Sequence, residues 1–234
     1  GYLTNPVRVE VSQPGKVADK VSHAVHFVTK DDKKNLLISL LNKNKTGRSL
    51  VFARTKHGAE RLMKQLEQTG FNAASIHGNK SQGQRDRAIA NFRDGSVEIL
   101  VATDVAARGI DIPDIEQVYN YDLPNVPENY VHRIGRTARA GRKGNAIAFC
   151  SAEEMSELRA IEKVLSIGIE VVGGTPWSDE TAKRAKSAAK EATKNAAAAR
   201  TEARRKKPRQ TTKPAAGKSS AGKSSASKPS ASKA

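Results

Sequence analysis

The sequence VATDVAARGIDIP, residues 101–113, begins with apolar residues and continues into a polar segment that contains glycine. This change is typical of a buried β-strand followed by a loop, in which hydroxyl, guanidinium and open backbone groups approach a ligand closely. In open α/β sheets, ligands bind at the carboxyl ends of the strands. The segment therefore predicts one strand of a parallel sheet with a binding loop after it.

The same pattern recurs on both sides of this segment. Short runs rich in valine and isoleucine alternate with longer segments of helical periodicity, as expected of parallel strands joined by crossover helices. The predicted strands are residues 24–29, 49–53, 73–76, 98–102, 117–121 and 146–150, and the predicted helices are residues 32–41, 58–68, 82–93, 127–139 and 153–165. We therefore predict an α/β domain with a mostly parallel central sheet at residues 21–177, after a lead-in of residues 1–20.

Residues 178–234 differ in composition from the rest of the chain. They hold 16 Lys and Arg against 4 Asp and Glu, and therefore most of the net charge of +17. They contain no aromatic residue, and such a segment buries too little apolar surface to offset its ordering entropy. We predict a disordered basic tail, in which the alanine-rich residues 181–205 favour transient helix. Its charge attracts polyanions such as RNA; a merely solubilising extension is the alternative.

Composition also excludes several classes of protein. Cys150 is the only cysteine, so no internal disulfide forms, and no segment has the ligand spacing of a zinc site. No apolar run is long enough to span a bilayer, and the amino terminus lacks a signal-peptide pattern. We expect a cytoplasmic protein without a membrane partner, zinc or another metal of its own. Because the chain begins with Gly1, we expect a fragment or a processed chain.

Three arginines recur at three-residue intervals in YVHRIGRTARAG, residues 130–141. On a helix, Arg133, Arg136 and Arg139 would occupy neighbouring positions of one face. Guanidinium groups in such an arrangement bind phosphate, and an arginine beside a transferring phosphoryl group stabilises its developing charge. The alternative is an ordinary basic surface helix.

Two further segments place polar side chains where predicted strands end. The sequence ARTK, residues 53–56, follows one buried strand, and HGNKSQGQR, residues 77–85, follows another and starts a helix. Gln82 and Arg85 lie one helical turn apart. Amide and guanidinium groups at a helix start bind phosphate oxygens together with free backbone N–H groups. The second segment therefore indicates contacts to phosphate, whereas the first lies at the edge where open α/β sheets bind their ligands.

In order along the chain, these segments resemble motifs IV, IVa, V and VI of the DEAD-box ATP-dependent RNA helicases. In motif VI, Ala138 stands where many members carry glycine. The resemblance covers residues 1–177 and only the second of the two RecA-like lobes of that family, so it implies a RecA-like three-layer fold. The sequence has no Gly-x-x-x-x-Gly-Lys-Ser/Thr phosphate loop and no Asp-Glu-Ala-Asp run, both of which belong to the first lobe.

The resemblance implies three groups of site residues. The ATP contacts are Asp111 at the ribose and the arginine fingers Arg136 and Arg139 at the γ-phosphate. The RNA contacts are Thr55, Gln82, Arg85, Thr103, Arg108 and Gly109. The residues that couple the two sites are Phe52, His132 and Arg133, with the Phe52 ring packed beneath the arginines of motif VI. For Phe52 the alternative is a plain core residue. We interpret Asp104 as an organiser of its loop, and for Asp104 and Asp111 the alternative is turn capping. We interpret His23, His26 and His57 as ordinary surface or strand residues.

The implied function is ATP-driven unwinding of short RNA duplexes, with Mg²⁺ held by the absent first lobe. Because phosphoryl transfer requires the phosphate loop and the metal together with the arginine fingers, we expect this chain alone to be inactive in ATP hydrolysis. A related remodelling ATPase that acts on DNA is a second candidate, but those branches usually carry glutamine at the position of His132. A non-enzymatic RNA-binding or RNA-chaperone protein that uses the lobe and the basic tail is the third.

Overall fold

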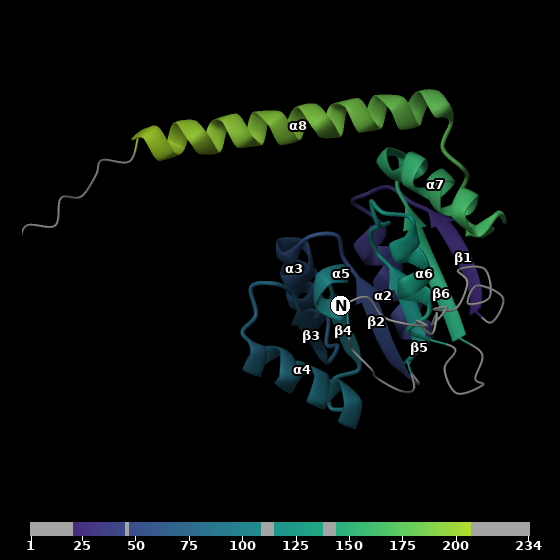
Figure 1. Cartoon of the computed structure of the whole chain (residues 1–234), viewed down its shortest axis with the longest axis vertical. Coiled ribbons are helices and arrows are strands. Elements are labelled where there is room, and N and C mark those ends of the chain that lie inside the picture. The colour runs from purple at the N-terminus through teal and green to yellow at the C-terminus, as the bar shows by residue number, and fades with distance from the viewer. Residues whose placement is uncertain (1–20, 45–46, 109–114, 138–143, 207–234) are drawn as a thin grey trace, which may run out of the picture. The chain divides into compact units, whose positions relative to one another are not determined.

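The computed structural model describes residues 21–44, 47–108, 115–137 and 144–206 (Figure 1). Seven strands form one sheet: β1 (Val21–Phe27), β2 (Arg48–Phe52), β3 (Ala73–Ile76), β4 (Ile99–Ala102), β5 (Ile115–Asn120), β6 (Gly144–Cys150) and β7 (Glu170–Gly173). Their order is β3-β4-β2-β5-β6-β1-β7, and every pair of neighbours is parallel. The predicted parallel α/β sheet is thus confirmed.

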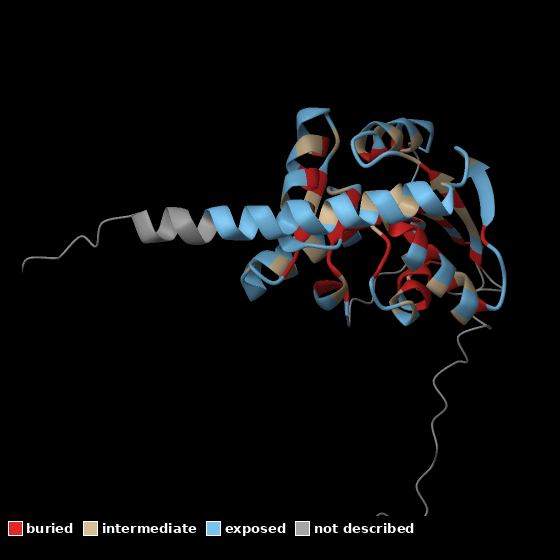
Figure 2. Ribbon diagram, turned by 90° about the horizontal axis from the view of Figure 1, so that it is seen from above, coloured by how far each residue is buried: buried red, intermediate tan, exposed pale blue. Residues whose placement is uncertain are grey.

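The helices are α2 (Lys33–Lys43), α3 (Lys56–Gln68), α4 (Gln82–Asp94), α5 (Asp104–Ala107), α6 (Glu128–Ile134), α7 (Met155–Leu165) and α8 (Asp179–Lys206), with a 3₁₀ turn at Ala152–Glu154. Successive residues of a strand point to opposite faces of a sheet, so each buried strand feeds two cores. Leu50 and Phe52 of β2 pack into the core beneath α4, α6 and α7, whereas Val51 packs into the core beneath α2 and α3. The result is three layers, with buried residues on both faces of the sheet (Figure 2).

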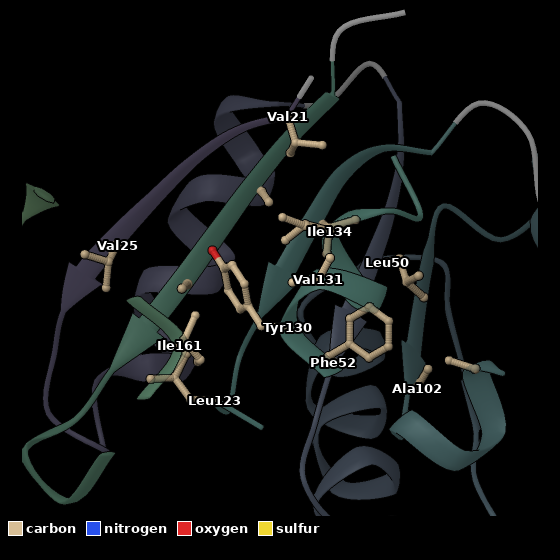
Figure 3. Packing of buried hydrophobic residues seen from close by; sticks show 14 of the residues in the cluster. Val21, Val25, Leu50, Phe52, Ala102, Leu123, Tyr130, Val131, Ile134 and Ile161 are labelled. Atoms are coloured by element: carbon tan, nitrogen blue, oxygen red, sulfur yellow. The ribbon is translucent and has the colours of Figure 1, made fainter. Parts of the chain in front are cut away.

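The larger core lies under the segment that contains the arginine row. Figure 3 shows Phe52 close to Val131 and Ile134, while Tyr130 extends from the same helix toward β6. All four side chains are buried. Burying apolar area stabilises the fold by roughly 25 cal/mol per Å². Packing of α6 on the sheet therefore fixes where the polar residues of this helix lie.

The strand register places the ligand-binding loops at one edge. Phe52, the last residue of β2, pairs with Ala102 of β4 on one side and with Asn120 of β5 on the other. Because the three strands are parallel and end at the same level, the segments that follow them meet at one edge of the sheet. The side chains predicted to bind ligand lie in these segments.

The arginine row does not form one helix, so this part of the prediction is wrong. The helix α6 ends at Ile134 with Gly135 as its C-cap, whereas the predicted helix ran to residue 139. The backbone N–H of Arg136 donates to the carbonyl of Arg133 at 3.0 Å, which is a three-residue turn. Glycine has low helix propensity, and such tighter turns are common where an α-helix ends. Arg133 and Arg136 therefore lie on a helix and on the turn after it.

Three further elements differ from the prediction. The short helix α5 lies inside the predicted loop, and the edge strand β7 was not predicted. Residues 179–206 form the helix α8, although a disordered tail was predicted there. The helix agrees with the predicted helical tendency of residues 181–205, which follows from the high helix propensity of alanine. Ala182 packs against the larger core, and Asp179 forms an ion pair with Arg159 of α7. Packing of the domain thus continues beyond residue 177.

The compact unit extends to Ala192, and the chain from Thr193 onward is a separate unit. The predicted lead-in of residues 1–20 and the tail residues 207–234 lie outside the described residues. Among the helices that the structure describes, none is both long enough and apolar enough to cross a membrane.

Candidate phosphate-binding site at the carboxyl edge of the sheet

A cavity of about 280 Å³ lies at the carboxyl edge, between β2, α5 and α6. Its lining is rich in nitrogen-bearing side chains and consists of Phe52, Asp104, Ala107, Arg108, Asn129, His132, Arg133 and Arg136. Phe52 and Arg133 form a buried floor, whereas Arg108 and His132 are exposed and Arg136 is half-buried. A cavity with an arginine-rich rim is suited to an anionic ligand.

Arg133 is the best-anchored side chain of this cavity. It is 1% exposed. Its Nε and Nη2 donate to the two carboxylate oxygens of Asp104 at 2.6 and 2.9 Å, and its Nη1 donates to Asn120 Oδ1 at 3.1 Å and to the Asp122 carbonyl at 2.6 Å. A bidentate pair of this kind fixes both position and orientation. Arg133 therefore organises the cavity from within, joining the segments that follow β4 and β5.

Phe52 lies directly under this arginine. The Arg133 Cζ atom is 4.9 Å from the centroid of the Phe52 ring, a distance at which a guanidinium is attracted to the ring face. Phe52 is also a fully buried member of the larger core. Phe52 is therefore a core residue and, at the same time, the ring on which the Arg133 guanidinium lies. Asp104, for which the sequence predicts a role in organising the loop or capping a turn, is the ion-pair partner of Arg133 in the first turn of α5.

Thr137 attaches the segment after α6 to the sheet. Its buried Oγ1 donates to the Ile115 carbonyl at 2.6 Å, at the start of β5. Sequence reasoning assigned no role to Thr137 or to Asn129, which lines the cavity. Both lie within two residues of the ends of the predicted helix at residues 127–139, but no motif spacing indicated a function for either. Together with Arg133, Thr137 holds the turn that carries Arg136.

The predicted RNA contacts gather on neighbouring segments of the same edge. Arg85 Nη1 donates to Gln82 Oε1 at 3.2 Å, and its Nη2 donates to the Ala106 carbonyl of α5 at 3.2 Å. Thr103, another predicted RNA contact, is the N-cap residue of α5, the helix to which Arg85 donates this hydrogen bond. The structure therefore brings the starts of α4 and α5 together.

Thr55 lies at the start of α3 and belongs to a different cavity. Its Oγ1 accepts a hydrogen bond from the Gly58 N–H at 3.0 Å and so caps α3. It lines a cavity of about 590 Å³ on the α2 and α3 side of the edge. The hydroxyl hydrogen of Thr55 can still donate to a ligand oxygen, because the capping bond uses only an acceptor position of this oxygen.

The floor of this second cavity is a buried ionic network that the sequence analysis missed. Lys33 is 2% exposed, and its Nζ donates to Glu154 Oε2 at 2.5 Å and to the Tyr121 carbonyl at 2.7 Å. Arg54 Nη2 donates to Glu154 Oε1 at 2.7 Å, and its backbone N–H donates to Asp122 Oδ2. No local spacing could reveal a pair 121 residues apart in the sequence, as Lys33 and Glu154 are. The network holds together the segments that follow β1, β2, β5 and β6.

Three predicted site residues, Gly109, Asp111 and Arg139, lie outside the described residues. Their roles remain predictions. Among the residues that the structure does describe, no group of three or more His, Cys, Asp or Glu side chains could hold a metal ion. Cys150 is buried in the core, and this burial raises the pKa of its thiol to about 12, so the thiolate is not available for catalysis at neutral pH.

A parallel sheet with helices on both faces and an arginine-lined cavity at its carboxyl edge defines a RecA-like domain. Residues 32–141 match the family described as the helicase conserved C-terminal domain. The chain is 42% identical over 167 residues to the pre-mRNA-splicing ATP-dependent RNA helicase PRP28 of Pyricularia oryzae, with 70% of this chain and 25% of the relative covered.

Solved structures agree with this match. The Escherichia coli DEAD-box protein SrmB, bound to regulator of ribonuclease activity A, is 39% identical with a TM-score of 0.61, and the match covers 68% of this chain and 92% of that one. Dbp5 of Saccharomyces cerevisiae, solved with RNA and ADP BeF3, is 37% identical with a TM-score of 0.61, over 71% and 44% of the two chains. The chain belongs to the DEAD-box RNA helicase family, as its C-terminal helicase domain. It spans between a quarter and two fifths of the curated relatives that it matches.

Proposed function

We propose that this chain is the C-terminal lobe of an ATP-dependent RNA helicase and supplies arginine fingers and RNA-backbone contacts for the unwinding of short RNA duplexes. The observation that carries the proposal is the cavity in which Arg108 and Arg136 surround the buried platform of Arg133 and Phe52. The predicted RNA contacts lie on the same edge. Dbp5, a relative with this fold, was solved with RNA and ADP BeF3.

In this proposal Arg136 and Arg139 bind the terminal phosphate of ATP, and Asp111 accepts a hydrogen bond from the ribose. ATP, when bound between the lobes, supplies the phosphoryl group, and Mg²⁺ is held by the first lobe. Arg133 does not contact phosphate; its four hydrogen bonds hold the α6 turn, so that Arg136 is positioned before the ligand arrives. His132 couples this site to RNA from the exposed face of α6.

The RNA contacts of the proposal are Thr55, Gln82, Arg85, Thr103, Arg108 and Gly109. Hydroxyl, amide and guanidinium groups at helix starts bind phosphate and sugar and do not read base edges, so sequence preference should be slight. We also place the protein in the cytoplasm, since its single cysteine is consistent with a reducing compartment.

The proposal is tested by comparing this chain alone with a protein in which it is joined to its first RecA-like lobe. We expect the chain alone to bind single-stranded RNA but to release no phosphate from ATP. We expect the two-lobe protein to hydrolyse ATP at a rate that RNA stimulates, because the catalytic groups are divided between the lobes. Release of inorganic phosphate and RNA fluorescence anisotropy are the measurements. An absence of RNA binding by the chain, or of stimulation in the two-lobe protein, contradicts the proposal.

The second unit of the chain favours an added electrostatic role in RNA binding. Residues 193–234 hold 12 Lys and Arg and a single acidic residue. Without catalysis, this charge and the lobe would form the non-enzymatic RNA-binding protein that is the alternative function. The two functions differ in ATP turnover of the two-lobe protein, which only the helicase shows.

Truncation after Ala192 should weaken RNA binding by about tenfold or more at low salt, because fewer counterions are released from the RNA. This cut keeps Ala182 and Lys186, which contact the domain. The anisotropy titration is repeated at several salt concentrations, and the slope of log affinity against log salt should become flatter. ATP turnover of the truncated two-lobe protein at saturating RNA should stay close to that of the intact protein. Identical affinity and slope before and after truncation would dismiss the role of the tail.

A further inference from the structure

One carboxylate connects the helix that carries Thr55 to the segment that carries Gln82 and Arg85. Glu60 lies on the second turn of α3, and its Oε2 accepts hydrogen bonds from Ser75 Oγ at 2.6 Å, His77 Nε2 at 3.1 Å and Lys80 Nζ at 2.9 Å. These donors belong to β3 and to the loop before α4. A single oxygen of α3 therefore holds the loop that leads into the predicted RNA-binding helix start.

The loop itself is built around His77. The backbone N–H of Asn79 donates to His77 Nδ1 at 3.3 Å, and the backbone N–H of Lys80 donates to the His77 carbonyl at 3.0 Å. Because Nδ1 accepts a hydrogen bond, the ring proton of a neutral His77 is on Nε2 and is donated to Glu60. The His77 ring is buried, so its orientation is fixed by both bonds.

A second contact and a helix cap complete the connection. Lys56 Nζ of α3 donates to Asn79 Oδ1 at 2.9 Å. Ser81 and Gln84 form a capping box at the start of α4, which fixes the first turn that carries Gln82 and Arg85. Arg85 then reaches the Ala106 carbonyl of α5. The starts of α3, α4 and α5 are thus linked by one continuous set of polar contacts.

Glu60 is poorly suited to contact RNA but well suited to hold its neighbours in place. Its carboxylate carries the same charge sign as phosphate, so direct contact would be repulsive. The hydrogen bond from Ser75 and those from Lys80 and His77 lower the pKa of Glu60 to about 2, so it is ionised at neutral pH. The side chain remains 30% exposed, and the free energy of unfolding should therefore depend on it only weakly.

We propose that Glu60 is a positioning residue for RNA binding: with the Lys56–Asn79 contact as a second link, it fixes the start of α4 relative to α3, so that Thr55, Gln82 and Arg85 meet one RNA backbone together. The inference rests on the proposed function, because it assumes that these three residues form the RNA face. It adds a residue that does not itself touch RNA.

The test compares Glu60→Gln with Glu67→Gln in the full chain. Glu67 lies two turns further along α3, is exposed, and its side chain has no hydrogen bond or ion pair within the described part of the chain. Both changes make the protein more positive by the same amount, and electrostatics alone would strengthen RNA binding in both. We expect Glu67→Gln to bind an oligouridine probe slightly more tightly, and Glu60→Gln to bind it about fivefold more weakly, from the loss of about one net hydrogen bond.

The salt dependence separates positioning from direct contact. Loss of one phosphate contact lowers the slope of log affinity against log salt by about 0.7 for single strands, and we expect this for Arg85→Ala. We expect Glu60→Gln to keep the slope of the unmodified chain. In the double variant, the effects of Glu60→Gln and Arg85→Ala should be less than additive, since both act through the same contact. If Glu60 only stabilised the fold, the folded Glu60→Gln variant would bind RNA as tightly as the unmodified chain. The double variant would then bind RNA as weakly as Arg85→Ala alone.

Several outcomes would overturn the inference. If Glu60→Gln binds RNA as tightly as Glu67→Gln, or more tightly because Lys80 is released toward the phosphates, Glu60 does not position the RNA face. If Glu60→Gln fails to fold by circular dichroism, the neutral variant Asn79→Ala decides the matter, because it breaks only the exposed contact with Lys56, and unchanged affinity then rejects the inference. If Arg85→Ala also binds normally, the RNA face of the proposed function is itself wrong, which is a different failure.

Discussion

Replacement of Arg136 by alanine in the two-lobe protein is expected to lower ATP turnover by a factor of roughly 10³ to 10⁵. Arg136 lines the cavity at the carboxyl edge, on the turn that Arg133 and Thr137 hold in place. An arginine cannot lose its proton near neutral pH, so its charge is present when negative charge builds up on the transferring phosphoryl group. Alanine removes this charge without disturbing the buried anchors. The measurement is steady-state phosphate release at saturating RNA and ATP.

RNA affinity without nucleotide should change little in the same variant, because Arg136 is not among the residues assigned to the RNA backbone. Lys64→Ala is a matched control, since it removes an equal charge from an exposed position of α3, which packs on the opposite face of the sheet. Its turnover should stay within about twofold of the unmodified protein, the range expected of a surface substitution. Equal losses of turnover and of RNA affinity in Arg136→Ala would contradict the assignment, and so would a turnover like that of the control.

Among the elements predicted from the sequence, the strands agree best with the structure. The prediction for residues 73–76 coincides with β3, and the other five predicted strands overlap β1, β2, β4, β5 and β6. The central strands β2 and β4 are buried along nearly their whole length, so their apolar runs are continuous and easy to recognise. The missed strand β7 lies at the sheet edge, and its Val171 and Val172 are largely exposed. An edge strand of four residues has too few apolar positions to stand out from a loop.

The arginine spacing shows where a periodic pattern misleads. Three-residue intervals fit both a helix and a succession of tighter turns, because neighbouring side chains share a face in either case. Gly135 ends the helix, because glycine has low helix propensity. The consequence for function is small, since Arg136 still lines the cavity. The consequence for geometry is larger: the Arg133 side chain is buried, whereas Arg136 lies on the rim of the cavity.

The polar contacts within the site could be predicted only in part. The placement of Phe52 under the arginine row came from the family resemblance, and the Arg133–Phe52 distance agrees with it. The partners Asp104 and Asn120 precede Arg133 by 29 and 13 residues. They reach it because β4, β2 and β5 are adjacent in the sheet, and this order is not encoded in any local spacing. Buried pairs of this kind follow from topology and so require the structure.

Replacement of Arg133 by methionine should lower the free energy of unfolding of this chain by about 3 kcal/mol, the low end of the usual cost of breaking a buried ion pair from one side, because the side chain of Asp104 is 26% exposed. Methionine has similar length and keeps apolar contact with Phe52, so the cavity term stays small. The loss arises because the Asp104 carboxylate, Asn120 Oδ1 and the Asp122 carbonyl lose their donor. Urea unfolding followed by circular dichroism measures it. The expected loss is a large share of the roughly 5 to 15 kcal/mol that a domain typically possesses.

The double variant Asp104→Leu with Arg133→Met separates charge compensation from general damage to the core. Removing both partners leaves no uncompensated charge, so part of the lost stability should return, as happens when buried ion pairs are replaced by apolar residues. Lys64→Ala, at an exposed position of α3, should unfold within about 0.5 kcal/mol of the unmodified chain. If Arg133→Met costs no more than this surface variant, Arg133 does not anchor the fold. Its hydrogen bonds to Asp104 and Asn120 would then be exchangeable with water, and the positioning of Arg136 would need another cause.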